Sequence, residues 1–189
     1  MGERTCGGCM GASRRGVLAA ASAFALDIAT GGARAEPADE RPKVGDLLVR
    51  VDGGAPLTPT DIAADAQPLA AWPLDPAGNV VRSGSRLNKV LVLRLDPETL
   101  GETAKERAAD GVLAYSAICP HAGCEVNGWS AERKLIECPC HSSHYDPRQA
   151  GAVIDGPTPR PLAGLPLKIV EGKLVVAKPF TGRVGIVPG

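Results

Sequence analysis

Four cysteines and all three histidines of the chain lie in two short stretches, C-P-H-A-G-C at residues 119–124 and C-P-C-H-S-S-H at residues 138–144. Thiolate and imidazole are ligands that zinc, copper and iron–sulfur sites share. Each stretch offers two cysteines with a histidine close by in the sequence. The pattern predicts one metal centre that is shared between two loops.

Three kinds of site remain open on these residues alone. A structural zinc ion takes four ligands, so six candidates are too many, and the spacings differ from those of common zinc fingers. Two disulfides would suit an exported chain, but they leave the histidines beside the cysteines unexplained. A [2Fe-2S] cluster would take one cysteine and one histidine from each stretch, and the remaining cysteines could form a disulfide. This third interpretation uses all four cysteines and also one histidine from each stretch.

The two stretches resemble the paired boxes of the Rieske iron–sulfur family, and the resemblance is most specific over residues 119–159. It implies a [2Fe-2S] cluster with Cys119 and Cys138 on one iron and His121 and His141 on the other. The resemblance also implies a disulfide between Cys124 and Cys140.

Two hydroxyl groups and a proline-rich loop extend the resemblance to the high-potential members of the family. Ser143 and Tyr145 stand where hydroxyls donate hydrogen bonds to a bridging sulfide and to the sulfur of the first ligand cysteine, which raises the reduction potential. Pro157, in G-P-T-P at 156–159, matches the loop that shields the cluster. His144 has no family role, and we expect a solvated loop histidine.

The rest of the chain predicts an all-β fold. Its 189 residues, 44% of them hydrophobic, suit one compact domain, and 23 glycines and 17 prolines indicate many turns. Strands are expected at 47–51, 89–95, 111–118 and 134–137, a hairpin at 165–178, and one short helix at 98–110 behind an Asp96 N-cap. With the resemblance, we expect an antiparallel β-sandwich of the Rieske type with a cluster-binding subdomain of two loops.

The N-terminal residues 1–35 have the features of an export signal. Arg14 and Arg15 precede an apolar run at 17–26 and then Ala-Arg-Ala at 33–35, which resembles a twin-arginine signal; an ordinary secretory signal is the alternative. The run is much shorter than the ~20 residues of a membrane span. Cleavage would remove Cys6 and Cys9, to which we assign no function. Residues 36–46 are predicted to be a flexible tether, and 47–189 the Rieske domain.

The boxes combine traits of two Rieske branches. Cytochrome bc-type subunits usually carry a bulky apolar residue where this chain has Ala122, threonine where it has Pro120, and glycine where it has Ser142. The proline of C-P-H and a soluble, twin-arginine-exported form are similar to the small subunit of arsenite oxidase. The disulfide and Tyr145 are similar to the bc branch.

The resulting prediction is a periplasmic one-electron carrier with no stand-alone catalytic site. Its partner would be a cytochrome b/c complex or the large subunit of an oxidase of the arsenite oxidase kind, with quinol as a candidate reductant and proton-coupled redox at the histidines. Membrane association would come only through a partner or an uncleaved signal. The net charge of zero gives no basis for nucleic-acid binding. An oxygenase component and a structural zinc or disulfide domain are the alternative classes.

Overall fold

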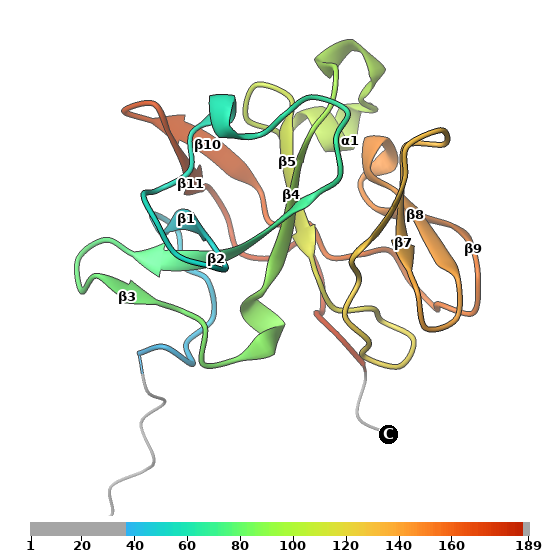
Figure 1. The fold of residues 1–189 in the computed structure, drawn as a ribbon, viewed down its shortest axis with the longest axis horizontal. Coiled ribbons are helices and arrows are strands. Elements are labelled where there is room, and N and C mark those ends of the chain that lie inside the picture. Colours follow the sequence, from blue (N-terminus) through green and yellow to red (C-terminus); the bar gives the residue numbers. More distant parts are fainter. Residues whose placement is uncertain (1–36, 187–189) are drawn as a thin grey trace, which may run out of the picture. The chain divides into compact units, whose positions relative to one another are not determined.

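The computed structural model describes residues 37–186, so the predicted export signal and its two cysteines lie outside the described residues. Two antiparallel sheets form this part of the chain (Figure 1). The larger sheet has the strand order β10-β11-β1-β2-β4-β5, with β3 paired to β2, and the smaller has the order β6-β7-β8-β9. The strands are β1 (Leu47–Arg50), β2 (Leu69–Asp75), β3 (Val80–Val81), β4 (Val90–Arg94), β5 (Val112–Ser116), β6 (Gly128–Ser130), β7 (Leu135–Cys138), β8 (Ser143–Asp146), β9 (Ala152–Asp155), β10 (Leu167–Val170) and β11 (Lys173–Val176).

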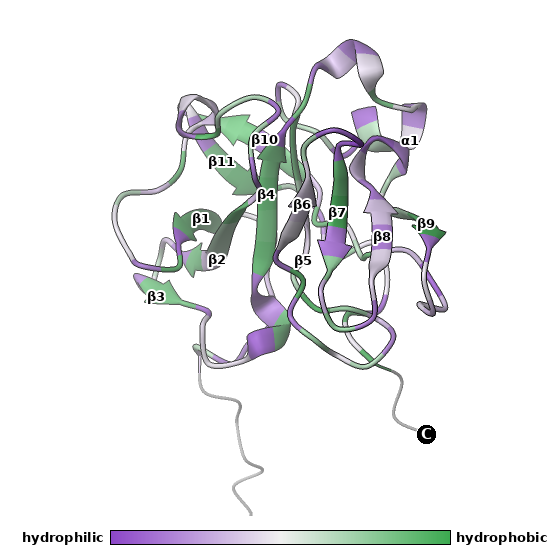
Figure 2. Ribbon diagram, turned by 45° about the vertical axis from the view of Figure 1, so that its right-hand side comes forward, coloured by the Kyte–Doolittle hydropathy of each residue, from purple (hydrophilic) through white to green (hydrophobic). Residues whose placement is uncertain are grey.

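Strands β4 and β5 are buried on both faces, and their alternating side chains supply two cores. Leu93 pairs with Leu113, and both pack in one core with Ile136 of the smaller sheet. Val92 pairs with Ala114, and both pack in a second core on the opposite face. Because side chains in a strand alternate between faces, two near-continuous apolar runs can supply both cores. Figure 2 shows β4 coloured hydrophobic along most of its length.

The all-β prediction is confirmed, and its local turn signals hold. The strands expected at 47–51, 89–95, 111–118 and 134–137 correspond to β1, β4, β5 and β7. In the predicted hairpin between β10 and β11, Glu171 and Gly172 have φ values of 50° and 75°. Two successive positive φ values define a type I′ turn, whose backbone twist matches the right-handed twist of the two flanking strands.

The helix expected at 98–110 is much shorter than predicted. Asp96 does cap a turn, because its carboxylate accepts a hydrogen bond from the Glu98 amide, but this turn is the 3-10 helix η3 (Pro97–Thr99). Gly101 then takes an extended conformation and its amide donates to the Arg148 carbonyl at 2.9 Å. The α-helix α1 (Glu102–Lys105) follows and has four residues. This tertiary contact at Gly101 therefore ends the first turn before a longer helix can form.

The predicted tether contains residues that contact the larger sheet. Arg82, which is 1% exposed, forms an ion pair with Asp46 at 2.6 Å and a second with Glu40 at 2.9 Å. A buried guanidinium needs such partners, because an unpaired charge in the interior is very costly. These contacts hold residues of the 37–46 segment on the sheet, whereas the division of the chain at 35 and 46 stays a prediction. Among residues 37–186, no helix has the length and apolar character of a membrane span.

Candidate metal centre

The first cysteine–histidine box is a tight turn just beyond strand β5. The Gly123 amide donates to the Cys119 carbonyl at 3.0 Å, and the Cys119 amide donates to the Cys124 carbonyl at 2.9 Å. Gly123 has a φ of 71°, a conformation that glycine adopts without steric cost. Cys119 is 1% exposed and belongs to the core between the two sheets. The turn therefore keeps Cys119 in the apolar interior and carries His121 on the loop beyond it.

The second box is the turn of the hairpin between β7 and β8. Cys138 is the last residue of β7 and pairs with Ser143, the first residue of β8. Ser142 completes the turn with a φ of 52°. Cys138 is 1% exposed, whereas Cys140 and His141 are exposed. Both boxes thus begin where a strand ends, as the sequence predicts.

The predicted disulfide between Cys124 and Cys140 is confirmed, and it joins the two boxes. Cys119 and Cys138 are the free cysteines among the described residues. The Cys138 sulfur lies within 4.8 Å of both disulfide sulfurs. These three sulfurs could suggest a metal site of their own, but the bonded pair has no thiolate to offer. Of the three, only Cys138 can offer a thiolate to a metal ion.

The histidines of the two boxes face each other. The ring centroids of His121 and His141 are 4.7 Å apart and the rings are nearly perpendicular, at 85°. His121 is half-buried, and its Nδ1 is buried without a hydrogen-bond partner among the described residues. His141 is exposed. The structure thus brings the two free thiols and the two imidazoles to one end of the smaller sheet, on loops joined by the disulfide.

The two predicted hydroxyls lie beside these groups on strand β8. The Tyr145 hydroxyl is 3.1 Å from the Cys119 sulfur, and the ring is fully buried. Burial raises the pKa of Tyr145, and the hydrogen bond with Cys119 raises it further, so the phenol keeps its proton. A thiolate can only accept, which makes the hydroxyl the donor when Cys119 is ionised. The Ser143 Oγ is also buried and lacks a partner among residues 37–186.

The proline-rich loop covers Ser143. Gly156 has a φ of 94°, and a Cβ placed there would lie 2.5 Å from the Ser143 Cα. Pro157 is exposed, whereas Thr158 is 8% exposed and its hydroxyl donates to the Arg160 carbonyl at 3.3 Å. Thr158 also partly offsets the raised pKa of Tyr145. No local motif indicates the influence of Thr158 on Tyr145, because the two residues come together only through the β8–β9 hairpin.

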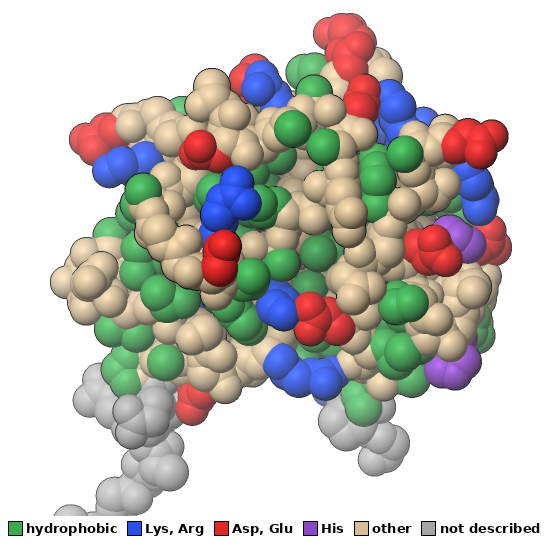
Figure 3. All heavy atoms as spheres, viewed as in Figure 1, with side chains coloured by type: hydrophobic (Ala, Val, Ile, Leu, Met, Phe, Trp, Pro, Cys, Tyr) green, Lys and Arg blue, Asp and Glu red, His purple; other side chains and the backbone are tan. Residues whose placement is uncertain are grey.

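No aspartate, glutamate, lysine or arginine occurs in the three loops at 119–124, 138–143 and 156–159. The exposed residues of these loops include Ala122, Pro139, His141 and Pro157. In Figure 3, acidic and basic side chains are interspersed over the visible face, and histidine side chains reach the surface on the side where β7 to β9 lie. The loops therefore present an uncharged tip around an accessible imidazole.

His144 differs from its prediction as a solvated loop histidine. It lies on strand β8, its side chain is 17% exposed, its Nδ1 contacts the Asp155 carboxylate, and its Nε2 is 3.9 Å from a Glu137 oxygen. Cross-strand pairing places these residues together, because His144 pairs with Glu137 on β7 and with Asp155 on β9. One partner therefore comes from β7, which the sequence predicts, and the other from β9, which it does not.

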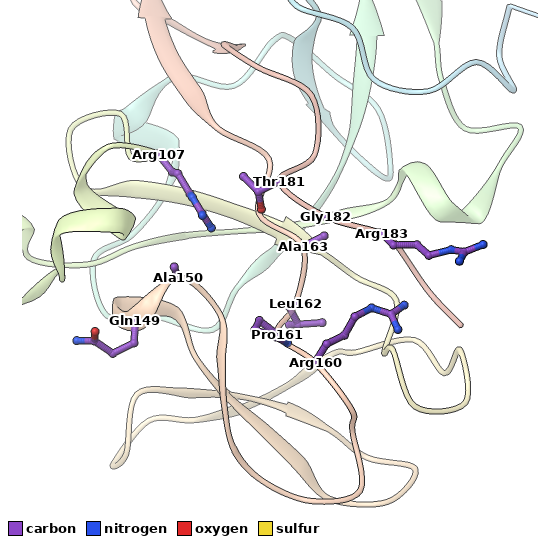
Figure 4. A pocket seen from close by; sticks show the side chains of 10 residues that line it. All are labelled: Arg107, Gln149, Ala150, Arg160, Pro161, Leu162, Ala163, Thr181, Gly182 and Arg183. Carbon is purple, nitrogen blue, oxygen red and sulfur yellow. The ribbon is translucent and has the colours of Figure 1, made fainter. Parts of the chain in front are cut away.

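A pocket of about 280 Å³ has none of the predicted ligands in its lining (Figure 4). Arg107 extends into it from one side, and Arg160 and Arg183 lie at the other end. Leu162 and Thr181 line the space between them. None of the predicted cluster residues lines this pocket.

Comparison with known proteins gives one family. A family model for the Rieske [2Fe-2S] domain matches residues 87–169. The cytochrome bc1 complex Rieske iron–sulfur subunit of Streptomyces lividans is 30% identical over 148 residues, which are 75% of this chain and 85% of that protein. A Haloferax mediterranei protein, named as a candidate Rieske subunit of a respiratory nitrate reductase, is 31% identical over 146 residues, which cover 76% of this chain and 63% of that protein.

A solved structure is also similar. It is the plasma membrane Rieske protein PetC3 of the cyanobacterium Synechocystis PCC 6803, with 21% sequence identity and a TM-score of 0.38. The match covers 59% of this chain and 87% of that one.

The donor set fits a [2Fe-2S] cluster. Burial raises the pKa of the Cys138 thiol, because the thiolate would lose its hydration, and a bound metal ion would offset that loss. Two of the four buried side-chain atoms without partners among the described residues, His121 Nδ1 and Ser143 Oγ, are a nitrogen that can ligate iron and a hydroxyl that can donate to sulfide. Two thiols, two imidazoles and two hydroxyls thus match what such a cluster requires.

Proposed function

Because this chain belongs to the Rieske [2Fe-2S] family, we propose that it is an exported one-electron carrier whose cluster is held by the two disulfide-linked loops. Cys119 and Cys138 would hold one iron, and His121 and His141 the other. The observation that carries the proposal is that two buried free thiols and two facing imidazoles meet at one uncharged tip. The cluster, when bound, supplies the one-electron chemistry.

The imidazole rings would allow proton-coupled redox chemistry. A histidine ligand uses one ring nitrogen and keeps the other, which can bind or release a proton near neutral pH. His141 is exposed at the tip and would hold that proton within reach of a partner or of quinol. His121 is half-buried and is less accessible as a residue than His141. His141 is therefore the proposed contact for the electron donor.

The protein chain would set the reduction potential through hydrogen bonds to sulfur. The Tyr145 hydroxyl lies 3.1 Å from the Cys119 sulfur, and the buried Ser143 hydroxyl is free to donate. Hydrogen bonds to sulfur stabilise the added electron and raise the potential. The proline loop covers Ser143 and excludes water from this side. These contacts favour a potential near the upper end of the Rieske range.

Titration of the potential against pH tests this proposal. The purified domain would be reduced anaerobically at several pH values while the cluster is followed by electron paramagnetic resonance. If one proton accompanies the electron, the potential falls by about 59 mV per pH unit above the histidine pKa. A potential that is independent of pH throughout the stable range would rule out proton coupling at the histidines.

We assign the periplasm as the location and a respiratory oxidoreductase as the partner. Export would use Arg14 and Arg15, and the test replaces both with lysine in the full chain. The expected result is that the protein stays in the cytoplasm, whereas the unchanged chain is found in the periplasmic fraction with Glu36 as its first residue. Periplasmic recovery of the double variant at the unchanged level would contradict export through the arginine pair.

Two classes of partner remain, and one observation favours the second. A cytochrome b/c complex is suggested by the name of the Streptomyces lividans relative. The large subunit of an oxidase or reductase is suggested by the name of the Haloferax relative, and exposed Ala122 leaves the tip without a bulky apolar contact. Reduction by a quinol in stopped-flow measurements would favour the first class. Rapid reduction only in the presence of a co-purified large subunit would favour the second.

A further inference from the structure

Arg86 reaches the first metal-binding turn from a distant part of the sequence. It begins the 3-10 helix η2 (Arg86–Asn88), and its Nη2 donates a hydrogen bond to the Gly123 carbonyl, 37 residues further along the chain. A Cβ placed at Gly123 would lie 3.2 Å from the same nitrogen. The guanidinium therefore packs directly against the backbone of the C-P-H-A-G-C turn.

Gly123 is the residue that closes this turn. Its amide bonds to the Cys119 carbonyl at 3.0 Å, so the segment between them, which carries His121, forms one closed loop. The next residue, Cys124, is fixed by the disulfide. Arg86 holds the remaining polar group of Gly123, its carbonyl oxygen. It thereby restrains the end of the turn that carries one thiol and one imidazole of the predicted ligand set.

The contact also brings a positive charge to loops that have none of their own. Within residues 37–186, Arg86 forms no ion pair with a carboxylate that would neutralise it. Lys89, the next basic residue in the sequence, is paired with Glu125 at 2.7 Å. Reduction adds a negative charge to a cluster, and an unneutralised cation nearby stabilises that state. The residue is exposed, so salt should screen its effect.

We propose that Arg86 is a positioning residue of the metal centre, which holds the Cys119–Gly123 turn through the Gly123 carbonyl and whose charge favours the reduced cluster. The inference rests on the proposed function. It predicts two separable effects: a geometric effect on the turn and an electrostatic effect on the potential. A residue with a purely structural role would produce the first without a salt-dependent second.

The test compares Arg86→Gln, Arg86→Lys and the control Arg50→Gln by voltammetry at low and high ionic strength. Arg50 is an exposed arginine on strand β1, outside the three loops. In Arg86→Gln the equilibrium constant for reduction should fall about threefold at low salt, which is about 28 mV for one electron. The difference should shrink in 1 M salt, where the Debye length is about 3 Å. Arg86→Lys should stay near the unchanged protein, and Arg50→Gln should not shift.

Several results would overturn the inference. They are an unchanged potential in Arg86→Gln, an equal shift in Arg50→Gln, or the same shift in Arg86→Lys as in Arg86→Gln. If Arg86→Gln loses its cluster while Arg86→Lys retains it, the requirement for a cation at this turn is supported. Absence of a Rieske spectrum in the unchanged protein would overturn the proposed function, whereas a normal spectrum with an insensitive potential would overturn this inference alone.

Discussion

Removal of the Tyr145 hydroxyl offers the sharpest test of how the chain would tune the cluster. Tyr145→Phe keeps the buried ring and deletes the oxygen that lies 3.1 Å from the Cys119 sulfur. The ring is fully buried in the core between the sheets, so the substitution keeps this packing while it removes the hydrogen bond with Cys119. The reduced state should lose more stabilisation than the oxidised state, because reduction increases the negative charge on sulfur. The potential should therefore fall.

The size of the fall follows from the energetics of hydrogen bonds. A bond to a charged group contributes about 1.5–3 kcal/mol, and one between neutral groups about 0.5–1.5 kcal/mol. The two redox states differ by part of this range, so we take a difference of about 1 kcal/mol. One electron at 59 mV per tenfold change converts this into about 40 mV. Direct voltammetry of the two proteins at one pH measures the shift.

The chain supplies a matched control in its other tyrosine. Tyr115 is 1% exposed and its hydroxyl donates to the Pro147 carbonyl at 2.7 Å, without a contact to a cysteine. Tyr115→Phe should reduce the free energy of unfolding by about 1 kcal/mol and leave the potential unchanged. Equal potentials in Tyr145→Phe and the unchanged protein would refute the role of the hydroxyl. An equal shift in both variants would assign the effect to general loosening of the core.

Three further predictions concern stability. Cys140→Ser removes a disulfide with a sequence separation of 16 and should lower the free energy of unfolding by about 2–4 kcal/mol in urea titrations; an unchanged midpoint would contradict this. Gly156→Ala should speed the loss of the cluster, measured by the decay of its absorbance, because the new Cβ would lie 2.5 Å from the backbone of β8. The control is Gly172→Ala, which has a similarly positive φ but open space around the new Cβ, and it should leave the rate of cluster loss unchanged. His144 donates a hydrogen bond to the Asp155 carboxylate and holds the pKa of that carboxylate below its ordinary value. The ionised carboxylate therefore stabilises the folded protein above the ordinary pKa of aspartate, and this stabilisation is lost as the pH falls through the lowered pKa of the folded state. Asp155→Asn should flatten the acid limb of stability against pH, and an identical limb would disprove the coupling.

The sequence could predict the site better than the sheet that carries it. The hairpin around Gly172 follows from a local pattern. The ligand set and the disulfide are expected from the resemblance to the Rieske family, because the residues alone leave three kinds of site open. Strand β8 is different, because S-H-Y-D has only one apolar residue and gives no alternating signal. Its strand state comes from pairing with β7 and β9 on both sides, which a local pattern cannot reveal.

Long-range contacts explain the other differences. The helix after Asp96 was overestimated, because the bond from Gly101 to Arg148 interrupts it, and the two residues are far apart in sequence. The contact of Arg86 with Gly123 joins segments 37 residues apart and follows no motif. Propensity and capping rules describe what a segment prefers alone, and tertiary contacts override them at such positions.

The most direct test of the central claim is the electron paramagnetic resonance spectrum of the reduced domain, recorded with nitrogen hyperfine coupling and metal analysis. The account predicts one [2Fe-2S] cluster per chain, with a Rieske spectrum and couplings from two imidazole nitrogens on one iron. The second coupling should vanish in a His141 variant that retains iron. A domain that contains zinc and gives no signal, or a cluster without nitrogen coupling, would contradict the account.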